Sequence, residues 1–290
     1  MTGFDFGSRE APSLDMAQKL LFGAEMNMKQ SGGLIYYSFS HMEPWSELTQ
    51  AALSRAGGVS EGPYASLNLS FAVDDDAEKV HVNLSRMAAA LRWDPDAMVS
   101  ARQIHGREAV PVVRDMVGRP DLPSCDALVT DEPGILLLLK FADCVPVTLW
   151  DPVRRVVGLA HAGWRGTIAG APGAAIELMV ERYGSRASDI LAGIGPSIGP
   201  CCYEVGPEVE RLASHVFAGA GVLQRESDAG VRLDLWTANS ETLMRAGVVE
   251  ENITVAGICT RCHSDLFFSH RAAGGQPAGR FGVVAGIRDE

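Results

Sequence analysis

The sequence has no run of basic residues, and its acidic side chains outnumber the basic ones by enough to give a net charge of −11. Proteins that bind nucleic acids hold the phosphates with clustered lysines and arginines. We therefore expect no nucleic-acid partner. A small anionic substrate is still compatible with the composition, because a few arginines gathered at one site can outweigh the field of the whole chain.

Segments that would export or anchor the protein are also missing. The first 18 residues carry Asp, Arg and Glu and lack the basic start and apolar stretch of a secretory signal. The longest apolar run, residues 134–150, contains Lys140 and Asp143 and falls short of a membrane span. We therefore expect a cytoplasmic protein without a membrane partner. Its six cysteines are then buried, metal-bound or reactive rather than disulfide-paired.

No linker, internal repeat or low-complexity tract divides the chain, and 47% of its residues are hydrophobic, which is enough for a large core. Residues 1–33 predict an N-terminal extension with a short helix around residues 13–26. Residues 34–290 predict one domain of mixed α/β (α+β) class, with mixed β-sheets at the core flanked by helices. The expected strands are residues 33–40, 97–106, 108–113, 125–130, 134–144, 145–152, 155–163, 189–194, 253–260 and 281–287, and the expected helices are residues 77–93, 167–184, 207–217 and 236–248.

Residues 259–263 read CTRCH, which has the C-x-x-C-H form of a covalent haem attachment site. Haem of that kind is attached outside the cytoplasm, and the chain shows no export signal. A zinc ribbon would need a second pair of cysteines at similar spacing, whereas Cys201 and Cys202 are adjacent. We therefore expect Cys259 and Cys262 to be a core cysteine and a loop cysteine that bind neither haem nor zinc.

Three of the expected strands end on a residue that can bind a metal: His105, Cys144 and His161. Strand ends followed by Gly or Pro loops are where α/β proteins place their sites. Two imidazoles and one thiolate suit zinc, and three protein ligands leave the fourth position open, as in catalytic zinc sites. The pattern alone leaves a second interpretation open, in which each is an ordinary strand-end residue with satisfied polar groups.

Several short segments together resemble the YfiH/laccase-domain family, whose members carry the labels polyphenol oxidase, purine nucleoside phosphorylase and peptidoglycan editing factor. The resemblance runs from about Gly33 to Ile287 and rests on the segments HAGWRG, ADCVP, QIHG, GPSIGPCCYEV, SRAGGVS, SLNLS and FFSHR…GR. It implies a YfiH-like catalytic domain with zinc bound by His105, Cys144 and His161. It also implies that the haem-like string at Cys259 is coincidental, and that His263 and His270 lie at a pocket rim or on the surface.

The resemblance extends to residues around the metal. It implies catalytic roles for Cys144 and His161, with Asp143 as a neighbouring acid–base or supporting group. The polar residues expected to bind substrate or phosphate are Arg55, Ser60, Asn68, Arg165, Arg271 and Arg280. Arginines suit phosphate because the guanidinium group can donate two parallel hydrogen bonds. Three positions depart from the family pattern: Ala72 replaces a His, Asp74 replaces a Gly, and Phe141 replaces a small polar residue.

The family implies a zinc-dependent purine nucleoside enzyme that phosphorolyses adenosine, inosine and methylthioadenosine and deaminates adenosine, since zinc with an open position can activate water. A nucleoside and phosphate would be its partners, and we expect a monomer or at most a weak dimer. An alternative is a hydrolase acting on peptidoglycan precursors with Cys144 as nucleophile. A copper polyphenol oxidase is disfavoured, because the chain has seven His and no H-x-H pair, although a single Cu²⁺ could occupy the site in vitro.

Overall fold

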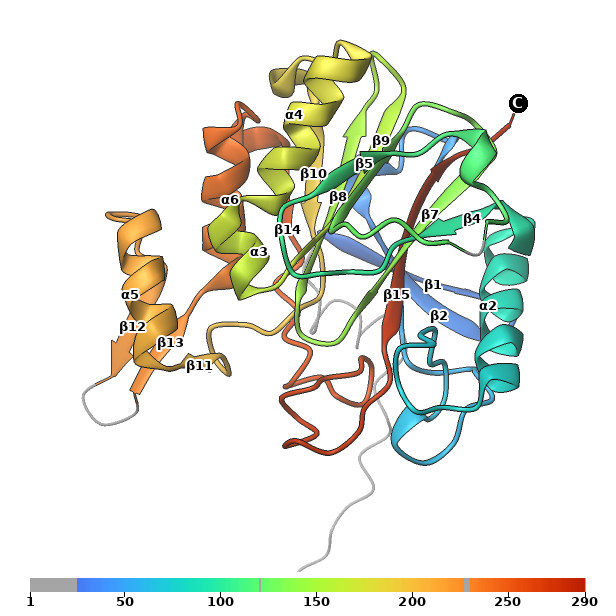
Figure 1. Cartoon of the computed structure of the whole chain (residues 1–290), viewed down its shortest axis with the longest axis horizontal. Helices are drawn as coiled ribbons and strands as arrows, with labels where there is room; N and C mark the ends of the chain where they lie inside the picture. Colours follow the sequence, from blue (N-terminus) through green and yellow to red (C-terminus); the bar gives the residue numbers. More distant parts are fainter. Residues whose placement is uncertain (1–24, 120, 227–229, 290) are drawn as a thin grey trace, which may run out of the picture.

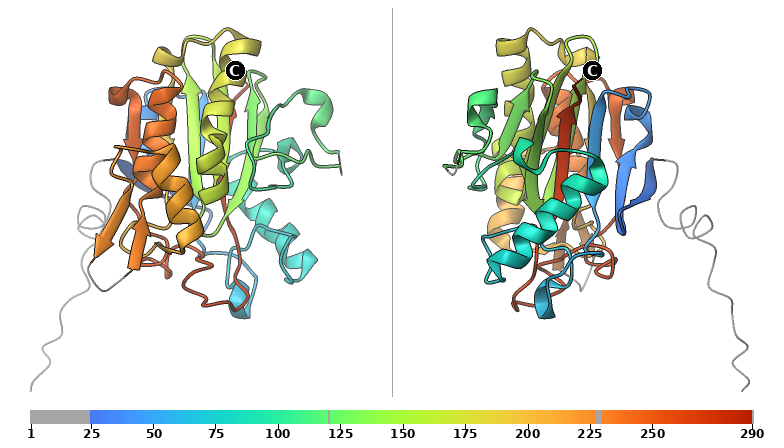
Figure 2. Two further views of the ribbon diagram at one scale, coloured as in Figure 1. Left: turned by 60° about the vertical axis from the view of Figure 1, so that its left-hand side comes forward. Right: turned by 90° about the vertical axis from the view of Figure 1, so that its right-hand side faces the viewer.

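The structure is a computed structural model that describes residues 25–119, 121–226 and 230–289, and these residues form two stacked β-sheets covered by helices (Figure 1). The helices among the described residues are α2 (Ala77–Leu91), α3 (Trp164–Ala169), α4 (Ala171–Tyr183), α5 (Pro207–Val216) and α6 (Leu235–Arg245). Helix α2 packs on one sheet, and α4 and α6 pack on the other (Figure 2). The predicted mixed α/β class is confirmed.

Both large sheets are mixed. The first has the order β1-β2-β3-β15-β7-β4, with strands β1 Met26–Ser31, β2 Leu34–Phe39, β3 Leu48–Leu53, β15 Phe281–Ile287, β7 Ile135–Phe141 and β4 Met98–Ser100. The second has the order β14-β10-β8-β9-β6-β5, with strands β14 Ile253–Val255, β10 Leu191–Ile194, β8 Val145–Asp151, β9 Val156–Ala162, β6 Ala127–Thr130 and β5 Ala109–Pro111. Parallel pairs join β4 to β7, β5 to β6 and β10 to β14, and the other pairs are antiparallel. A small third sheet holds β11 Glu204–Val205, β13 Gly230–Leu233 and β12 Leu223–Glu226.

The continuous apolar runs in the sequence arise because the central strands are buried on both faces. Successive side chains of a strand point to opposite faces. In β7, Leu137 and Leu139 face the second sheet, whereas Leu136 and Leu138 pack under α2. The chain therefore builds three apolar layers, one between the two sheets and one beneath the helices on each outer face.

The structure differs from the expected elements in several places. Strands β3, β11, β12 and β13 were not predicted, and the expected strand over residues 253–260 ends at Val255. The expected helix over residues 167–184 begins at Trp164 and divides into α3 and α4 at Gly170, whose φ of 82° is left-handed. The expected strand over residues 97–106 ends at Ser100, so His105 lies in a loop. Strand β1 pairs with β2 in the first sheet, so residues of the expected extension contribute to it. The helix expected around residues 13–26 lies almost wholly outside the described residues.

No helix in the described part of the chain has both the length and the apolar character needed to cross a membrane.

Candidate metal centre

His105, Cys144 and His161 come together in the structure. Their ligand atoms all lie within 4.8 Å of one another, and the two imidazole rings meet edge to face with centroids 4.9 Å apart. The three residues come from the loop after β4, the bend between β7 and β8, and the end of β9. Two imidazoles and a thiolate in this arrangement fit a zinc ion with one open position.

Strand pairing sets the positions of Cys144 and His161. Strands β8 and β9 are antiparallel with Val145 opposite Ala162, so Cys144, directly before β8, meets the end of β9. The close approach requires a glycine at position 163. A Cβ added there would lie 2.8 Å from the Cys144 sulfur, which is closer than real Cβ contacts allow.

Asp126 organises both histidines, and the sequence analysis did not identify it. Its carboxylate lies 2.9 Å from Nδ1 of His161 and accepts the backbone N–H of His105 at 3.0 Å and of Gly106 at 2.6 Å. These bonds explain why residue 105 lies in a loop, with φ of 58°. The only signal in the sequence was a charged residue at the head of the apolar run 125–130, and Asp126 is fully buried.

The contact with Asp126 also fixes the chemistry of His161. Because Nδ1 faces the carboxylate, Nε2 is the nitrogen that can bind a metal, and such carboxylate–histidine pairs are usual behind zinc ligands. The ring of Phe141 packs against His161 at 5.4 Å. Phe141, which replaces the small polar residue of the family pattern, therefore packs an apolar ring against the candidate ligand His161.

Cys144 and His161 shift each other's ionisation. Burial opposes the thiolate of Cys144, but the charge of His161 and hydrogen bonds with both histidines lower its pKa to about 6. Burial also opposes the imidazolium of His161, but the thiolate and Asp126 raise its pKa to about 9. The pair thus favours the thiolate, which is the form that binds metals.

A cavity of about 340 Å³ opens beside this cluster. It is lined by His105, Ala142, Asp143, Cys144, Gly163, Trp164, Arg165, Ile198, Tyr203, Leu235, His270 and Arg271. The guanidinium group of Arg165 lies 4.2 Å from the centroid of the Trp164 ring, and that of Arg271 lies 5.1 Å from the centroid of the Tyr203 ring. Two arginines, two aromatic rings and the three candidate ligands therefore share one cavity.

Asp143 also lines the cavity, and its carboxylate holds the C-terminal loop. One oxygen accepts the hydroxyl of Thr260 at 2.7 Å, and the other accepts the backbone N–H of Arg271 at 2.6 Å. Its φ of 85° places Asp143 outside a regular strand, so the alternation of side chains along β7 does not determine which way its carboxylate points. Its acid–base role stays a prediction.

Arg280 and Arg55 occupy different surroundings. Arg280 is largely buried, and burial lowers its pKa against the opposing effect of the nearby Cys144 and Asp143, so its charge lies close enough to act on the site. Arg55 donates to the backbone carbonyls of Ala65 at 2.9 Å and Ser264 at 2.8 Å and stacks on a phenylalanine ring. Neither arginine is among the described residues that line the cavity, and the predicted roles of both in phosphate binding stay predictions.

Asp75 links the side chains of Ser60 and Asn68. The Asp75 carboxylate accepts the Ser60 hydroxyl at 2.7 Å and the Asn68 amide at 2.8 Å. Asn68 in turn accepts the backbone N–H of Arg280 at 2.9 Å. Asp75 lies in the segment that contains the departures Ala72 and Asp74. Through Asn68, it connects this segment to Arg280 near the candidate metal site.

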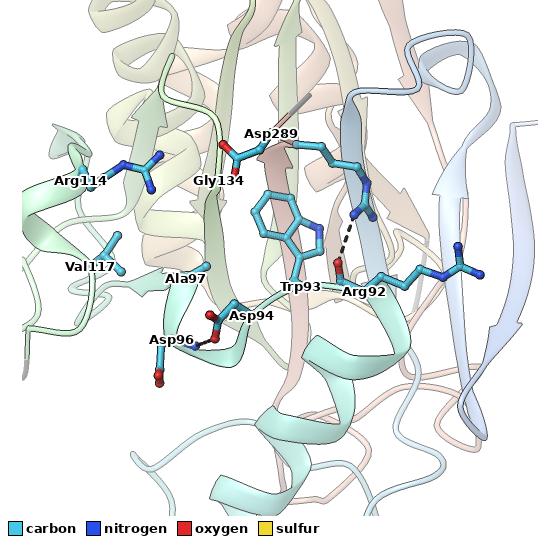
Figure 3. Close-up of a pocket in the computed structure, with 10 residues that line it drawn as sticks. Arg92, Trp93, Asp94, Asp96, Ala97, Arg114, Val117, Gly134 and Asp289 are labelled. Atoms are coloured by element: carbon cyan, nitrogen blue, oxygen red, sulfur yellow. Dashed lines mark hydrogen bonds between the residues drawn. The ribbon is translucent and has the colours of Figure 1, made fainter.

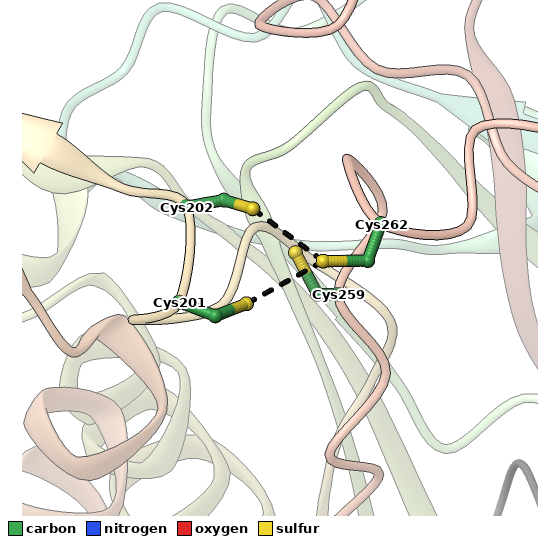
Figure 4. A group of neighbouring side chains, drawn as sticks. All are labelled: Cys201, Cys202, Cys259 and Cys262. Carbon is green, nitrogen blue, oxygen red and sulfur yellow. Dashed lines mark hydrogen bonds between the residues drawn. The ribbon is translucent and has the colours of Figure 1, made fainter.

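Four of the other five cysteines form a second cluster, which the sequence analysis did not foresee. The sulfur atoms of Cys201, Cys202, Cys259 and Cys262 all lie within 4.8 Å of one another (Figure 4). Cys259 is buried and Cys262 is exposed, as expected, and the prediction that they bind no metal stays a prediction. The adjacency of Cys201 and Cys202 does not prevent them from meeting this pair. Spacing along the chain does not limit which sulfurs meet once the fold brings two loops together.

A separate cavity of about 440 Å³ lies at the opposite end of β7, beside Gly134 (Figure 3). Two of its three arginines donate hydrogen bonds to backbone carbonyls. Arg288 donates to the carbonyls of Leu91 and Arg92, and Arg114 donates to the carbonyl of Pro133. No histidine or cysteine lines it among the described residues. The His105, Cys144 and His161 cluster lies at the other end of β7.

The chain is similar to several known proteins. Residues 49–288 match the family described as Multi-copper polyphenol oxidoreductase laccase. The chain is 39% identical over 255 residues to Purine nucleoside phosphorylase YlmD of Geobacillus stearothermophilus, covering 85% of this chain and 93% of that protein. It is 41% identical over 238 residues to a purine nucleoside phosphorylase of Deinococcus radiodurans, covering 82% and 88%.

Solved structures of related proteins have the same fold. The crystal structure of YlmD from Geobacillus stearothermophilus superimposes with a TM-score of 0.84 at 36% identity, covering 90% of this chain and 99% of that one. The Bacillus licheniformis protein YfiH superimposes with a TM-score of 0.83 at 33% identity, again covering 90% and 99%. The chain belongs to the YfiH/laccase-domain family, and its relatives carry the name purine nucleoside phosphorylase.

Proposed function

We propose that this protein is a zinc-dependent purine nucleoside phosphorylase that cleaves adenosine, inosine and methylthioadenosine and also deaminates adenosine. The observation that carries the proposal is the convergence of His105, Cys144 and His161 in a cavity that Arg165 and Arg271 also line. The names of the relatives support the reaction class.

The cavity offers complementary surfaces for the two substrates. Trp164, Tyr203 and Leu235 supply aromatic and apolar area for a purine. Arg165 and Arg271 supply positive charge, and the guanidinium group is suited to bidentate contact with phosphate. A phosphate held there is oriented against a bound nucleoside, which removes much of the entropic barrier to reaction.

In phosphorolysis, a phosphate oxygen forms a bond to the anomeric carbon of the ribose while the bond from that carbon to the purine nitrogen breaks. The electron pair leaves with the base, which takes up a proton. Asp143 lines the cavity, and in this proposal it assists that proton transfer. Zinc bound by His105, Cys144 and His161 would supply Lewis-acid polarisation to the reacting groups.

The test is an assay of adenosine with and without phosphate in which adenine, inosine and hypoxanthine are resolved. We expect adenine and ribose 1-phosphate only when phosphate is present, and inosine under both conditions. The loss of both activities in Cys144→Ala, with the fold retained by circular dichroism, would support the site. Adenine release that does not depend on phosphate would contradict the phosphorylase assignment.

A cysteine hydrolase acting on peptidoglycan precursors is the second candidate, and one observation favours it. The lowered pKa of Cys144, the raised pKa of His161 and the contact of His161 with Asp126 form a cysteine–histidine–aspartate arrangement. Zinc separates the two proposals, because a zinc-bound thiolate is a poor free nucleophile. Chelation should abolish phosphorolysis, whereas it should release a cysteine hydrolase from inhibition.

A further inference from the structure

The Cys201–Cys202–Cys259–Cys262 cluster has the dimensions of a metal site. The Cys262 sulfur lies 3.6 Å from that of Cys201 and 3.4 Å from that of Cys202. Four sulfurs at zinc–sulfur bond lengths of about 2.3 Å in a tetrahedron are separated by about 3.8 Å. A disulfide requires about 2.05 Å. The observed separations are therefore close to those of a tetrathiolate site and far from those of a covalent bond.

The backbone holds the two cysteine loops together before any metal binds. Ser197 and Cys259 form a parallel bridge, in which Ser197 donates to the carbonyl of Ile258 at 3.1 Å and Thr260 donates to that of Ser197 at 3.0 Å. Gly199 fits between its neighbours only because it lacks a side chain: a Cβ there would lie 2.7 Å from the Trp236 ring and 3.2 Å from the Cβ of Cys259. A site whose ligands are already positioned loses little conformational freedom on binding.

The surroundings of Cys259 stabilise a thiolate. Its side chain is buried, and the backbone N–H groups of Cys262, Gly199 and Arg261 are directed at its sulfur. Backbone N–H groups directed at a sulfur offset part of the negative charge of a metal–thiolate group. Cys201 and Cys262 are exposed, so an ion can reach the cluster from solvent.

We propose that Cys201, Cys202, Cys259 and Cys262 form a second zinc site, structural rather than catalytic. Four cysteine ligands fill a tetrahedral zinc and leave no open position, whereas the His105–Cys144–His161 site keeps one open. Thiolate ligands select zinc over the hard cations that prefer oxygen.

The place of this site in the fold gives it a role in shaping the cavity. Cys202 directly precedes Tyr203, which lines the cavity. Cys259 directly precedes Thr260, whose hydroxyl binds Asp143, and the N–H of Ile198 donates to the Asp143 carbonyl at 2.9 Å. Zinc at the four cysteines therefore fastens two loops that carry part of the cavity wall and leaves the reacting groups untouched.

The test measures metal content in variants that remove one site at a time, purified anaerobically with reductant. His105→Ala/His161→Ala removes two ligands of the first site and should retain roughly one zinc per chain, held by the four cysteines. Cys144→Ala is a second variant for the same purpose, since it leaves the contact between Asp126 and His161 in place. Adding Cys262→Ser to either variant should remove the remaining zinc.

Two further measurements identify the ligands of the second site and its effect on the melting temperature. Co²⁺ bound to Cys144→Ala should show the intense sulfur-to-metal charge-transfer bands of a tetrathiolate site, and Cys262→Ser should abolish them. Zinc should raise the melting temperature of Cys144→Ala in proportion to its occupancy. Cys144→Ala that contains no zinc, whether its four thiols are free or disulfide-bonded, would overturn the proposal, and so would iron in place of zinc.

Discussion

The carboxylate of Asp126 lies 2.9 Å from Nδ1 of His161, and the same carboxylate accepts backbone N–H groups from the loop that carries His105. One buried acid thus orients two candidate metal ligands that are 56 residues apart in the sequence (161 − 105). The side chain that sets the geometry of the centre is therefore not itself a ligand.

Asp126→Asn should weaken zinc binding at the first site by about 10- to 100-fold, the usual effect of removing such a partner. The amide keeps the size of the side chain but loses the charge that holds His161 and the loop around Gly106. Competition with a chromophoric chelator measures the affinity. Asp131→Asn, at an exposed position shortly after the same strand, is the matched control and should bind zinc as the wild type does.

The thiolate of Cys144 should titrate well below an ordinary thiol in metal-depleted protein. Its pKa is lowered to about 6 from 9.0, so the thiolate forms as the pH rises through about 6 and is lost again on acidification. The difference in thiolate absorbance between the wild type and Cys144→Ala reports this group among the six cysteines. His161→Asn removes the positive charge and should move the midpoint upward, whereas a wild-type midpoint near 9 would show that the histidines do not stabilise the thiolate.

Arg165→Ala should lower phosphorolysis more than deamination, because only phosphorolysis uses phosphate. The loss of charge-assisted contacts worth about 1.5–3 kcal/mol corresponds to about a 10- to 150-fold drop in efficiency, expressed mainly in the KM for phosphate. Both reactions are to be measured on the same preparation. Equal losses would mean that Arg165 supports the nucleoside or the fold.

Arg55→Ala is the informative comparison, since Arg55 is also a predicted phosphate ligand. A selective loss of phosphorolysis would support that role. Its hydrogen bonds to the carbonyls of Ala65 and Ser264 give a competing explanation, in which the substitution loosens a loop and lowers both reactions together with the melting temperature.

Gly193→Ala should destabilise the fold by about 1–3 kcal/mol through overpacking between the two sheets. A Cβ at this position of β10 would lie 2.3 Å from the ring of Phe39 in β2. Denaturant unfolding measures the effect. Gly206→Ala is the control, because an added Cβ there meets no atom within 4 Å and the backbone φ of −81° suits alanine. An equal effect of the two substitutions would argue against close packing of the sheets at Phe39.

The sequence predicted most strands of the two large sheets and most helices, because strands buried on both faces and amphipathic helices leave periodic patterns along the chain. It did not predict β1, β3 or the small third sheet. It also identified the three candidate ligands of the first site, although His105 proved to lie in a loop. Asp126 was missed because a buried acid whose partners are distant in sequence leaves no local pattern. The convergence of Cys201 and Cys202 with Cys259 and Cys262 was not predicted, since the bridge between Ser197 and Cys259 that creates it is a long-range contact.

The central claim is that phosphorolysis depends on zinc at His105, Cys144 and His161. The most direct measurement is phosphate-dependent adenine release from adenosine by protein stripped with a chelator and then titrated with zinc, with Cys144→Ala treated in parallel. The account predicts that stripping abolishes the activity of the wild type, that zinc restores it, and that Cys144→Ala stays inactive at every zinc concentration. Full activity in the stripped protein, or zinc-restored activity in Cys144→Ala, would contradict it.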